Sequence, residues 1–252
     1  MLARAGFIAA DEEAAELIAA AAGDAARLEA MLVRRLTGEP LAWITGRVLF
    51  CGVDVRVDPG VYVPRWHSEL IARRVAERLP EHGVAVDLCT GSGALACVLM
   101  VERPSARVLA CDIDERAVRC AVGNGVEAYR GDLFAPLPHD VAGRVDVVCA
   151  VVPYVPTAEL PLLQRDTFTF ESALAYDGGV DGAELLRRAV AESARWLRPG
   201  GALLLELGGD QPAAIAADLV RHGYVDLRVL RDEEGDPRGV EATFSSPSSI
   251  LP

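Results

Sequence analysis

Short apolar runs and longer amphipathic segments alternate along the chain and predict its elements in order. Residues 11–37 are rich in alanine and leucine, which predicts two short helices with Asp11 and Asp24 as N-caps. The β-branched residues of 48–57, interrupted by a Cys-Gly pair, predict a β-hairpin. A small helical segment and a hairpin therefore precede the larger part of the chain.

From residue 84 the pattern changes to buried strands that alternate with helices. Strands are expected before Gly131 and at 84–88, 107–111, 145–151, 202–206, 225–230 and 240–244. Helices are expected at 94–100, 114–123, 181–197 and 212–222, with Asp114 and Asp181 as caps. Such alternation predicts an α/β fold with a mostly parallel, seven-stranded sheet covered on both faces. The loop between the last two strands is too short for a helical crossover, so we expect these strands to pair antiparallel.

Composition and charge exclude several classes of function. The 252 residues include 37 acidic and 25 basic side chains, the latter all arginine, for a net charge of −12. So acidic a surface argues against nucleic acid as a partner, because that binding depends on neutralising phosphates. No apolar run reaches the roughly 20 residues that a membrane helix needs, and the first residues lack a signal-peptide core. We expect a cytoplasmic protein that binds neither nucleic acid nor a membrane.

The six cysteines lie mostly in apolar or strand-like runs, and none forms a C-x-x-C pair. A zinc site would need cysteines and histidines clustered at ligand spacing. We therefore expect structural thiols in a reducing compartment and no metal site.

A glycine-rich turn after the first core strand is the sharpest local signal for chemistry. It runs from Asp87 through Leu-Cys89-Thr90-Gly91-Ser92 to Gly93. The glycines allow a tight turn and let backbone N–H groups approach a ligand at a helix N-terminus. A dinucleotide site or a purely structural turn has the same spacing. The acidic Asp87 favours S-adenosylmethionine (SAM), because its carboxylate attracts the cationic end of that cofactor and repels a pyrophosphate.

Two further carboxylates follow the next strands. Asp112, with Ile113 beside it, ends the second core strand 19 residues beyond Gly93 and is placed to accept both ribose hydroxyls. Asp132 follows the third strand and offers an acceptor for an adenine amino group, with Leu133 and Phe134 as the adjoining wall. A solvated turn is the alternative interpretation of Asp132.

With these sites in order, the chain resembles the HemK/PrmC family of protein glutamine-N5 methyltransferases from about Gly38 to Thr243. Besides the sites above, the motifs that carry the resemblance are Gly38–Gly46, Val63-Pro-Arg65 with Ser68-Glu69, Phe170-Glu171, Leu174–Gly182 and Leu197–Gly201. The resemblance implies a class I SAM methyltransferase fold, SAM as cofactor and a glutamine side chain of a protein as methyl acceptor. It also implies cofactor contacts from the whole turn 89–93 and from Arg65, which is either a carboxylate clamp or a solvated loop residue.

One motif departs from the family pattern. Where the family has Asn-Pro-Pro-Tyr, this chain has Val151-Val152-Pro153-Tyr154. The resemblance implies that this segment binds the acceptor, with the Asn side chain and a neighbouring carbonyl accepting the two amide N–H groups. Valine supplies no acceptor, so a small-molecule N- or O-methyltransferase and a catalytically silent SAM-binding protein remain alternatives. His67 and Glu69 are the candidate bases for an acceptor that must lose a proton, and a surface histidine at the start of a helix is the alternative interpretation of His67.

We expect four parts along the chain. They are a short helical segment over 1–46, a hairpin linker over 47–63, a SAM-binding methyltransferase domain over 64–244 and a flexible tail over 245–252. The sequence leaves the oligomeric state of the protein open.

Overall fold

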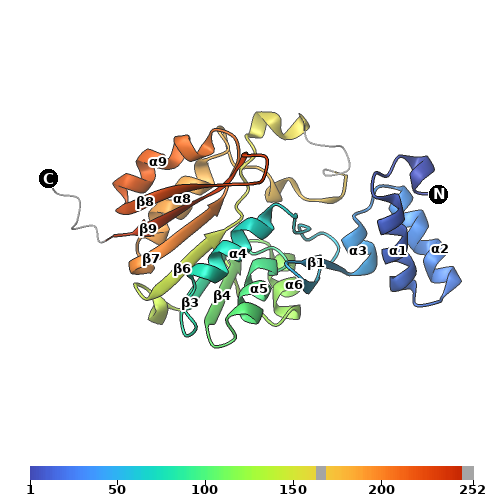
Figure 1. The fold of residues 1–252 in the computed structure, drawn as a ribbon, viewed down its shortest axis with the longest axis horizontal. Helices are drawn as coiled ribbons and strands as arrows, with labels where there is room; N and C mark the ends of the chain where they lie inside the picture. The colour runs from blue at the N-terminus through green and yellow to red at the C-terminus, as the bar shows by residue number, and fades with distance from the viewer. Residues whose placement is uncertain (163–168, 246–252) are drawn as a thin grey trace.

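The computed structural model describes residues 1–162 and 169–245, and a seven-stranded sheet forms its centre (Figure 1). In spatial order the strands are β5 (Glu127–Arg130), β4 (Arg107–Asp112), β3 (Val84–Leu88), β6 (Val145–Ala150), β7 (Leu197–Glu206), β9 (Pro237–Phe244) and β8 (Tyr224–Arg231). The first five run parallel, whereas β9 pairs antiparallel with both β7 and β8. The predicted mostly parallel sheet with a terminal antiparallel hairpin is confirmed.

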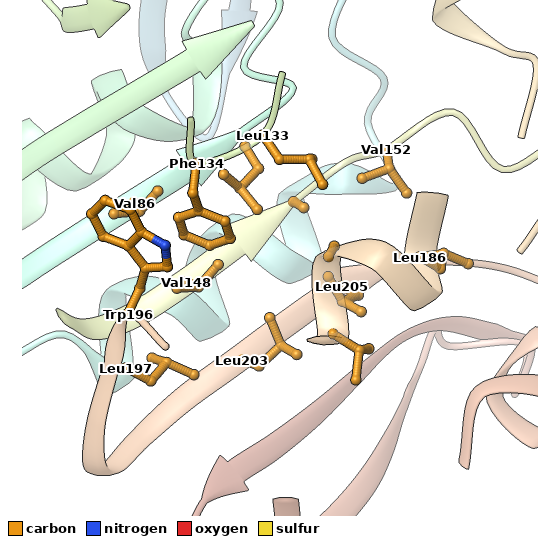
Figure 2. Close-up of a cluster of buried hydrophobic side chains, with 14 of the residues drawn as sticks. Val86, Leu133, Phe134, Val148, Val152, Leu186, Trp196, Leu197, Leu203 and Leu205 are labelled. Atoms are coloured by element: carbon orange, nitrogen blue, oxygen red, sulfur yellow. The ribbon is translucent and has the colours of Figure 1, made fainter. Parts of the chain in front are cut away.

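Helices cover both faces of the sheet, as the buried strands require. On one face pack α8 (Glu184–Ser193) and α9 (Gln211–Arg221), and on the other α4 (Ser68–Arg78) and α5 (Ala94–Glu102). Alternate residues of each strand point to opposite faces. Val86 therefore belongs to the cluster under α8 and α9 shown in Figure 2, while its neighbour Ala85 packs under α4 and α5. Beyond α5, α6 (Glu115–Gly123) packs beside β4 and β5.

The N-terminal helices form a separate small cluster at one end of the molecule (Figure 1). It contains α1 (Ala10–Ala21), α2 (Ala25–Leu36) and α3 (Leu41–Thr45), which bury Leu17 and Met31 between them. The hairpin of β1 (Arg47–Phe50) and β2 (Val53–Arg56) follows and inserts Phe50 and Val55 into the core beside α4 and α5. Short 3-10 turns lie at Ala3–Ala5, His139–Val141, Thr157–Leu162 and Ala173–Ala175.

Two of the predicted helix N-caps are observed as caps, and one is not. Asp24 and Asp114 cap α2 and α6 by accepting backbone N–H bonds from Arg27 and Arg116. Asp11 lies inside the first turn of α1, whose N-cap is Ala9, so that prediction was wrong. Asp181 accepts the N–H of Ala183 in the turn ahead of α8, whose first helical residue is Glu184.

Strand β7 is longer than predicted. It begins at Leu197, five residues before the predicted start, because Leu197 already pairs with Val145 ahead of an irregularity in the ladder. Of the predicted tail, residues 246–252 lie outside the described part of the chain. Every helix among the described residues is too short or too polar to span a membrane.

Candidate active site

A cavity of about 950 Å³ opens at the carboxyl ends of β3, β4, β5 and β6. The chain leaves β3 towards β4 on one side and returns through β6 on the other, and ligands of parallel α/β sheets bind where strand order reverses in this way. The predicted site residues that line the cavity are Arg65, His67, Cys89, Thr90, Gly91, Ser92, Asp112, Ile113, Asp132, Leu133, Val151, Val152, Pro153 and Tyr154. The fold therefore brings five separate segments of the sequence to one space.

The glycine-rich turn forms the floor of the cavity, but its two glycines have different roles. Both have positive φ, +58° at Gly91 and +81° at Gly93. A Cβ on Gly91 would meet open space, so only its backbone conformation favours glycine. A Cβ on Gly93 would lie 3.0 Å from the Cβ of Ala121 in α6. Gly93 thus permits close packing behind the turn and does not line the cavity.

Asp87 lies behind the turn and does not border the cavity, so the predicted direct contact with the cofactor is not what the structure shows. Its side chain is 2% exposed and accepts a 2.6 Å bond from the hydroxyl of Thr90. Burial raises the pKa of Asp87 to about 7. The residue acts on the cavity through Thr90, which it orients.

Asp112 borders the cavity and joins the turn to β4. One carboxylate oxygen accepts the N–H of Gly91 and the other accepts the N–H of Asp114, both at 2.9 Å. Each carboxylate oxygen can accept a further bond, so the side chain still has capacity for two hydroxyl donors. This pair of acceptor oxygens fits a ribose diol placed over the turn.

The segment after β5 places some of its side chains at the cavity and one in the core. Asp132 lies at the rim, half exposed, and pairs with Arg188 at 2.8 Å. Leu133 lines the cavity in a left-handed conformation, with φ of +44°. Phe134 is 2% exposed and stacks on Trp196 in the core, 5.2 Å between ring centroids (Figure 2). The expectation that Phe134 forms an aromatic wall was wrong, because the positive φ of Leu133 turns the next side chain inwards.

The Val151–Tyr154 segment follows β6, the strand that pairs with β3, and forms a wall of the cavity. Val151 is half buried and borders the cavity, whereas the side chain of Val152 is 1% exposed and packs into the core (Figure 2). The Tyr154 hydroxyl donates to Glu206 at 3.2 Å. The two valine side chains of this wall supply no hydrogen-bonding group. A polar acceptor can therefore meet only backbone carbonyl groups and Tyr154 on this wall.

Arg65 is bound within the protein. Its guanidinium donates to Glu171 at 2.6 Å and to the hydroxyl of Tyr176 at 3.0 Å. Glu171 is 4% exposed and also accepts the N–H of Val63. The charge of Arg65 is therefore balanced by Glu171, 106 positions along the chain, so the interpretation as a solvated loop residue was wrong. Arg65 lines the cavity, and its contact with the cofactor stays a prediction.

His67 immediately precedes α4 and lines the cavity beside Trp66, whose side chain is 67% exposed. Burial, together with nearby Arg238 and Arg65, lowers the pKa of His67, so the imidazole is neutral at pH 7. Its Nδ1 is buried and has no hydrogen-bond partner among the described residues. Glu69, the other candidate base, accepts the N–H of Cys51 and lies away from the cavity.

Several cavity residues were not predicted as site residues, chiefly Tyr62, Ser68, Tyr176 and Arg188. Ser68 and Tyr176 lie in the motifs Ser68-Glu69 and Leu174–Gly182 of the family resemblance, which could have indicated them, whereas no motif of the sequence marks Tyr62 or Arg188. No cluster of metal-ligating side chains occurs in the described ranges.

The residues present fit SAM. The cavity is within the range of about 300–1,000 Å³ usual for small-molecule sites. Ser92 borders the cavity, and its hydroxyl oxygen is buried without a hydrogen-bond partner within the described chain, which is typical of a polar group that a ligand satisfies. With Asp112 for the ribose and Ile113 and Leu133 as apolar surface for the base, the chemistry of the lining matches that of the cofactor.

Comparison with solved structures supports the fold. A methyltransferase from Pyrococcus furiosus superposes with a TM-score of 0.53 at 19% identity, covering 85% of this chain and 98% of that one. A ribosomal protein L11 methylase from Lactobacillus delbrueckii subsp. bulgaricus gives 0.52 at 20% identity, covering 76% and 84%.

Sequence comparison identifies the family. The family model described as "Methyltransferase small domain" matches residues 53–138. A release factor glutamine methyltransferase from Geobacter sulfurreducens is 34% identical to this chain, and the match covers 83% of this chain and 75% of that protein. One from Moorella thermoacetica is 40% identical, and the match covers 88% of this chain and 80% of that protein. One from Mycolicibacterium smegmatis is 38% identical, covering 86% and 79%. The chain belongs to this HemK/PrmC family of release factor glutamine methyltransferases and is a SAM-dependent N-methyltransferase.

Proposed function

We propose that this protein methylates the side-chain amide nitrogen of a glutamine in a release factor. The observation that carries the proposal is the shared cavity, which both the glycine-rich turn after β3 and the Val151–Tyr154 segment after β6 line. Identity of 34–40% to release factor glutamine methyltransferases over most of the chain supports the same acceptor.

On this proposal the cofactor-side residues act by holding and orienting. Asp112 accepts the ribose hydroxyls, Asp132 accepts from the adenine amino group, and Ser92 supplies a buried hydroxyl. Binding of an adenine at Asp132 competes with Arg188, which pairs with that carboxylate at 2.8 Å. Asp87 acts indirectly, by orienting Thr90 in the floor of the cavity.

SAM, when bound, would supply an activated methyl group to the amide nitrogen, with its sulfur as the leaving group. The amide nitrogen must then lose one proton. The carbonyl of Val152 accepts one amide N–H, and Tyr154 packs beside the acceptor and limits its orientation. His67, neutral at pH 7, accepts the proton and passes it to solvent.

A transfer assay tests this proposal. The native protein is incubated with SAM labelled in its methyl group and with a release factor, and with a matched release factor in which the acceptor glutamine is replaced by asparagine. We expect label in the first protein and none in the second. Equal labelling of both, or of neither, would contradict the proposal.

A second candidate function is methylation of a small apolar molecule at nitrogen. The aliphatic side chain of Val151 at the cavity wall favours it, because an apolar acceptor loses no hydrogen bond there. A panel of small apolar amines in the same assay distinguishes the two: turnover of an amine without any label in release factor would favour the second candidate.

A further inference from the structure

Tyr154 is held by hydrogen bonds at two separate points. Its hydroxyl donates to Glu206 at the end of β7, 3.2 Å away. Its backbone carbonyl accepts a 2.7 Å bond from the side-chain nitrogen of Gln211, the first residue of α9. Two side chains from outside the Val151–Tyr154 segment therefore fix both the direction of the ring and the position of the main chain.

Gln211 joins three chain segments through one amide group. Its nitrogen donates to the carbonyl of Gly182 at 3.1 Å as well as to Tyr154, and its oxygen accepts the N–H of Gly208 at 3.1 Å. All donor and acceptor positions that face these segments are thus in use. An alanine at this position would free three backbone groups at once.

The main chain around Tyr154 is closely packed by neighbouring glycines. A Cβ on Gly178 would lie 2.8 Å from the Cα of Tyr154, and a Cβ on Gly182 would collide with the Tyr154 carbonyl. The adjoining amides are also paired, Val155 with the carbonyl of Tyr176 and Thr157 with that of Gly179, both at 2.9 Å. The position of the Tyr154 main chain is therefore set by contacts on several sides.

Glu206 has a carboxyl group buried beside Tyr154, and burying such a group costs free energy. Its side chain is 3% exposed, and burial raises its pKa above the ordinary value. A buried carboxyl group is costly to ionise, and a buried acceptor could be supplied by a neutral side chain at less cost. The bond that it makes points at the one aromatic ring of the proposed acceptor wall.

We propose that Glu206 and Gln211 are positioning residues for methyl transfer, which hold Tyr154 against the cavity by its hydroxyl and its backbone carbonyl. This inference rests on the proposed function, in which Tyr154 orients the acceptor. Neither residue lines the cavity. They act through Tyr154, and transfer requires the acceptor nitrogen to be held within a few tenths of an ångström of its reactive position.

The experiment compares Gln211→Ala with Asp210→Ala, a matched control at the neighbouring exposed position that makes no side-chain cap bond. Hydrogen exchange is read at the amides of Val155 and Thr157, and kinetics are read on release factor. We expect faster exchange at both amides and a kcat lower by about 10- to 100-fold in Gln211→Ala, with affinity for S-adenosylhomocysteine unchanged. The control should resemble the native protein.

Glu206 is tested by Glu206→Ala and by the conservative Glu206→Gln, which retains an oxygen that accepts the Tyr154 hydroxyl. We expect Glu206→Ala to lower kcat by about tenfold or more and Glu206→Gln to restore most of it. If Glu206→Ala does not fold, Gln211→Ala and Glu206→Gln decide the matter, because a lower kcat in Glu206→Gln would show that the charge and not the bond matters.

Each outcome bears on the inference. Unchanged exchange at Val155 and Thr157 in Gln211→Ala overturns it, as does faster exchange with an unchanged kcat. Inactivity of the native protein on release factor would instead refute the proposed function, and the exchange data alone would then decide whether Gln211 holds Tyr154.

Discussion

Replacing Asp87 by asparagine should remove a pH-dependent destabilisation of the fold. The carboxyl group is 2% exposed, and burial raises its pKa from 3.8 to about 7. Between about pH 4 and pH 7 the native state therefore keeps a proton that the unfolded chain has lost. Stability falls with rising pH wherever the native state binds more protons, so the contribution of Asp87 is most favourable below pH 4 and is fully lost above pH 7.

The magnitude follows from the two pKa values. One pKa unit corresponds to about 1.4 kcal/mol, so ionised Asp87 destabilises the native state by about 4 kcal/mol above pH 7. Asparagine retains an oxygen that accepts the hydroxyl of Thr90, and it does not ionise. Its amide group adds an offset that is the same at every pH and does not alter the slope.

Urea unfolding at a series of pH values between 5 and 8 measures the effect. We expect the free energy of unfolding of Asp87→Asn to gain on that of the native protein by about 2.5–3 kcal/mol across this range, since part of the full difference falls below pH 5. Carboxyl groups distant from Asp87 titrate in both proteins and cancel in the difference. If the difference in free energy of unfolding between the two proteins stays constant with pH, Asp87 does not have a raised pKa in the native state.

Three other changes have direct outcomes. Val151→Asn restores an amide acceptor at the cavity wall and should raise kcat/KM on release factor by about tenfold or more, since an unpaired buried N–H costs about 1–3 kcal/mol. Asp112→Ala should weaken SAM binding in calorimetry by at least about tenfold, or about 1.4 kcal/mol. Glu241→Ala should lower the free energy of unfolding by about 2 kcal/mol or more, because this 3%-exposed carboxylate accepts two bonds from Arg74. Glu77→Ala, which removes an exposed partner of the same arginine, should change it by less than about 1 kcal/mol.

Each of these expectations has a contradicting result. No gain in Val151→Asn would show that the wall does not contact the acceptor amide. An unchanged dissociation constant in Asp112→Ala would remove its assignment to the ribose. Equal losses of stability in Glu241→Ala and Glu77→Ala would show that burial does not govern the strength of these ion pairs.

Local patterns were sufficient to predict most of the fold. Buried runs such as Val84–Leu88 and the N-caps Asp24 and Asp114 are signals that a few neighbouring residues determine. The start of β7 was missed because the Pro-Gly-Gly that follows Leu197 is typical of a turn. Only pairing with β6, set by tertiary contacts, shows that the strand has already begun there.

The site was predictable at the ends of strands and less so elsewhere. The turn after β3 and Asp112 after β4 could be placed because parallel strands bring their carboxyl ends together. The direction in which Phe134 points depends on the left-handed conformation of Leu133. No local sequence pattern predicts that conformation for a leucine. The pairing of Arg65 with Glu171 joins loops 106 residues apart, and no local pattern predicts such a contact.

Glutamine methylation is tested by tandem mass spectrometry of a release factor incubated with the native protein and SAM. We expect the added mass of one methyl group, located on the side-chain amide of a single glutamine. We also expect this modification to be lost when Asp112→Ala replaces the native protein at low SAM concentration. A methyl group on another residue beside an unmodified glutamine, or no modification at all, would rule out glutamine methylation by this protein.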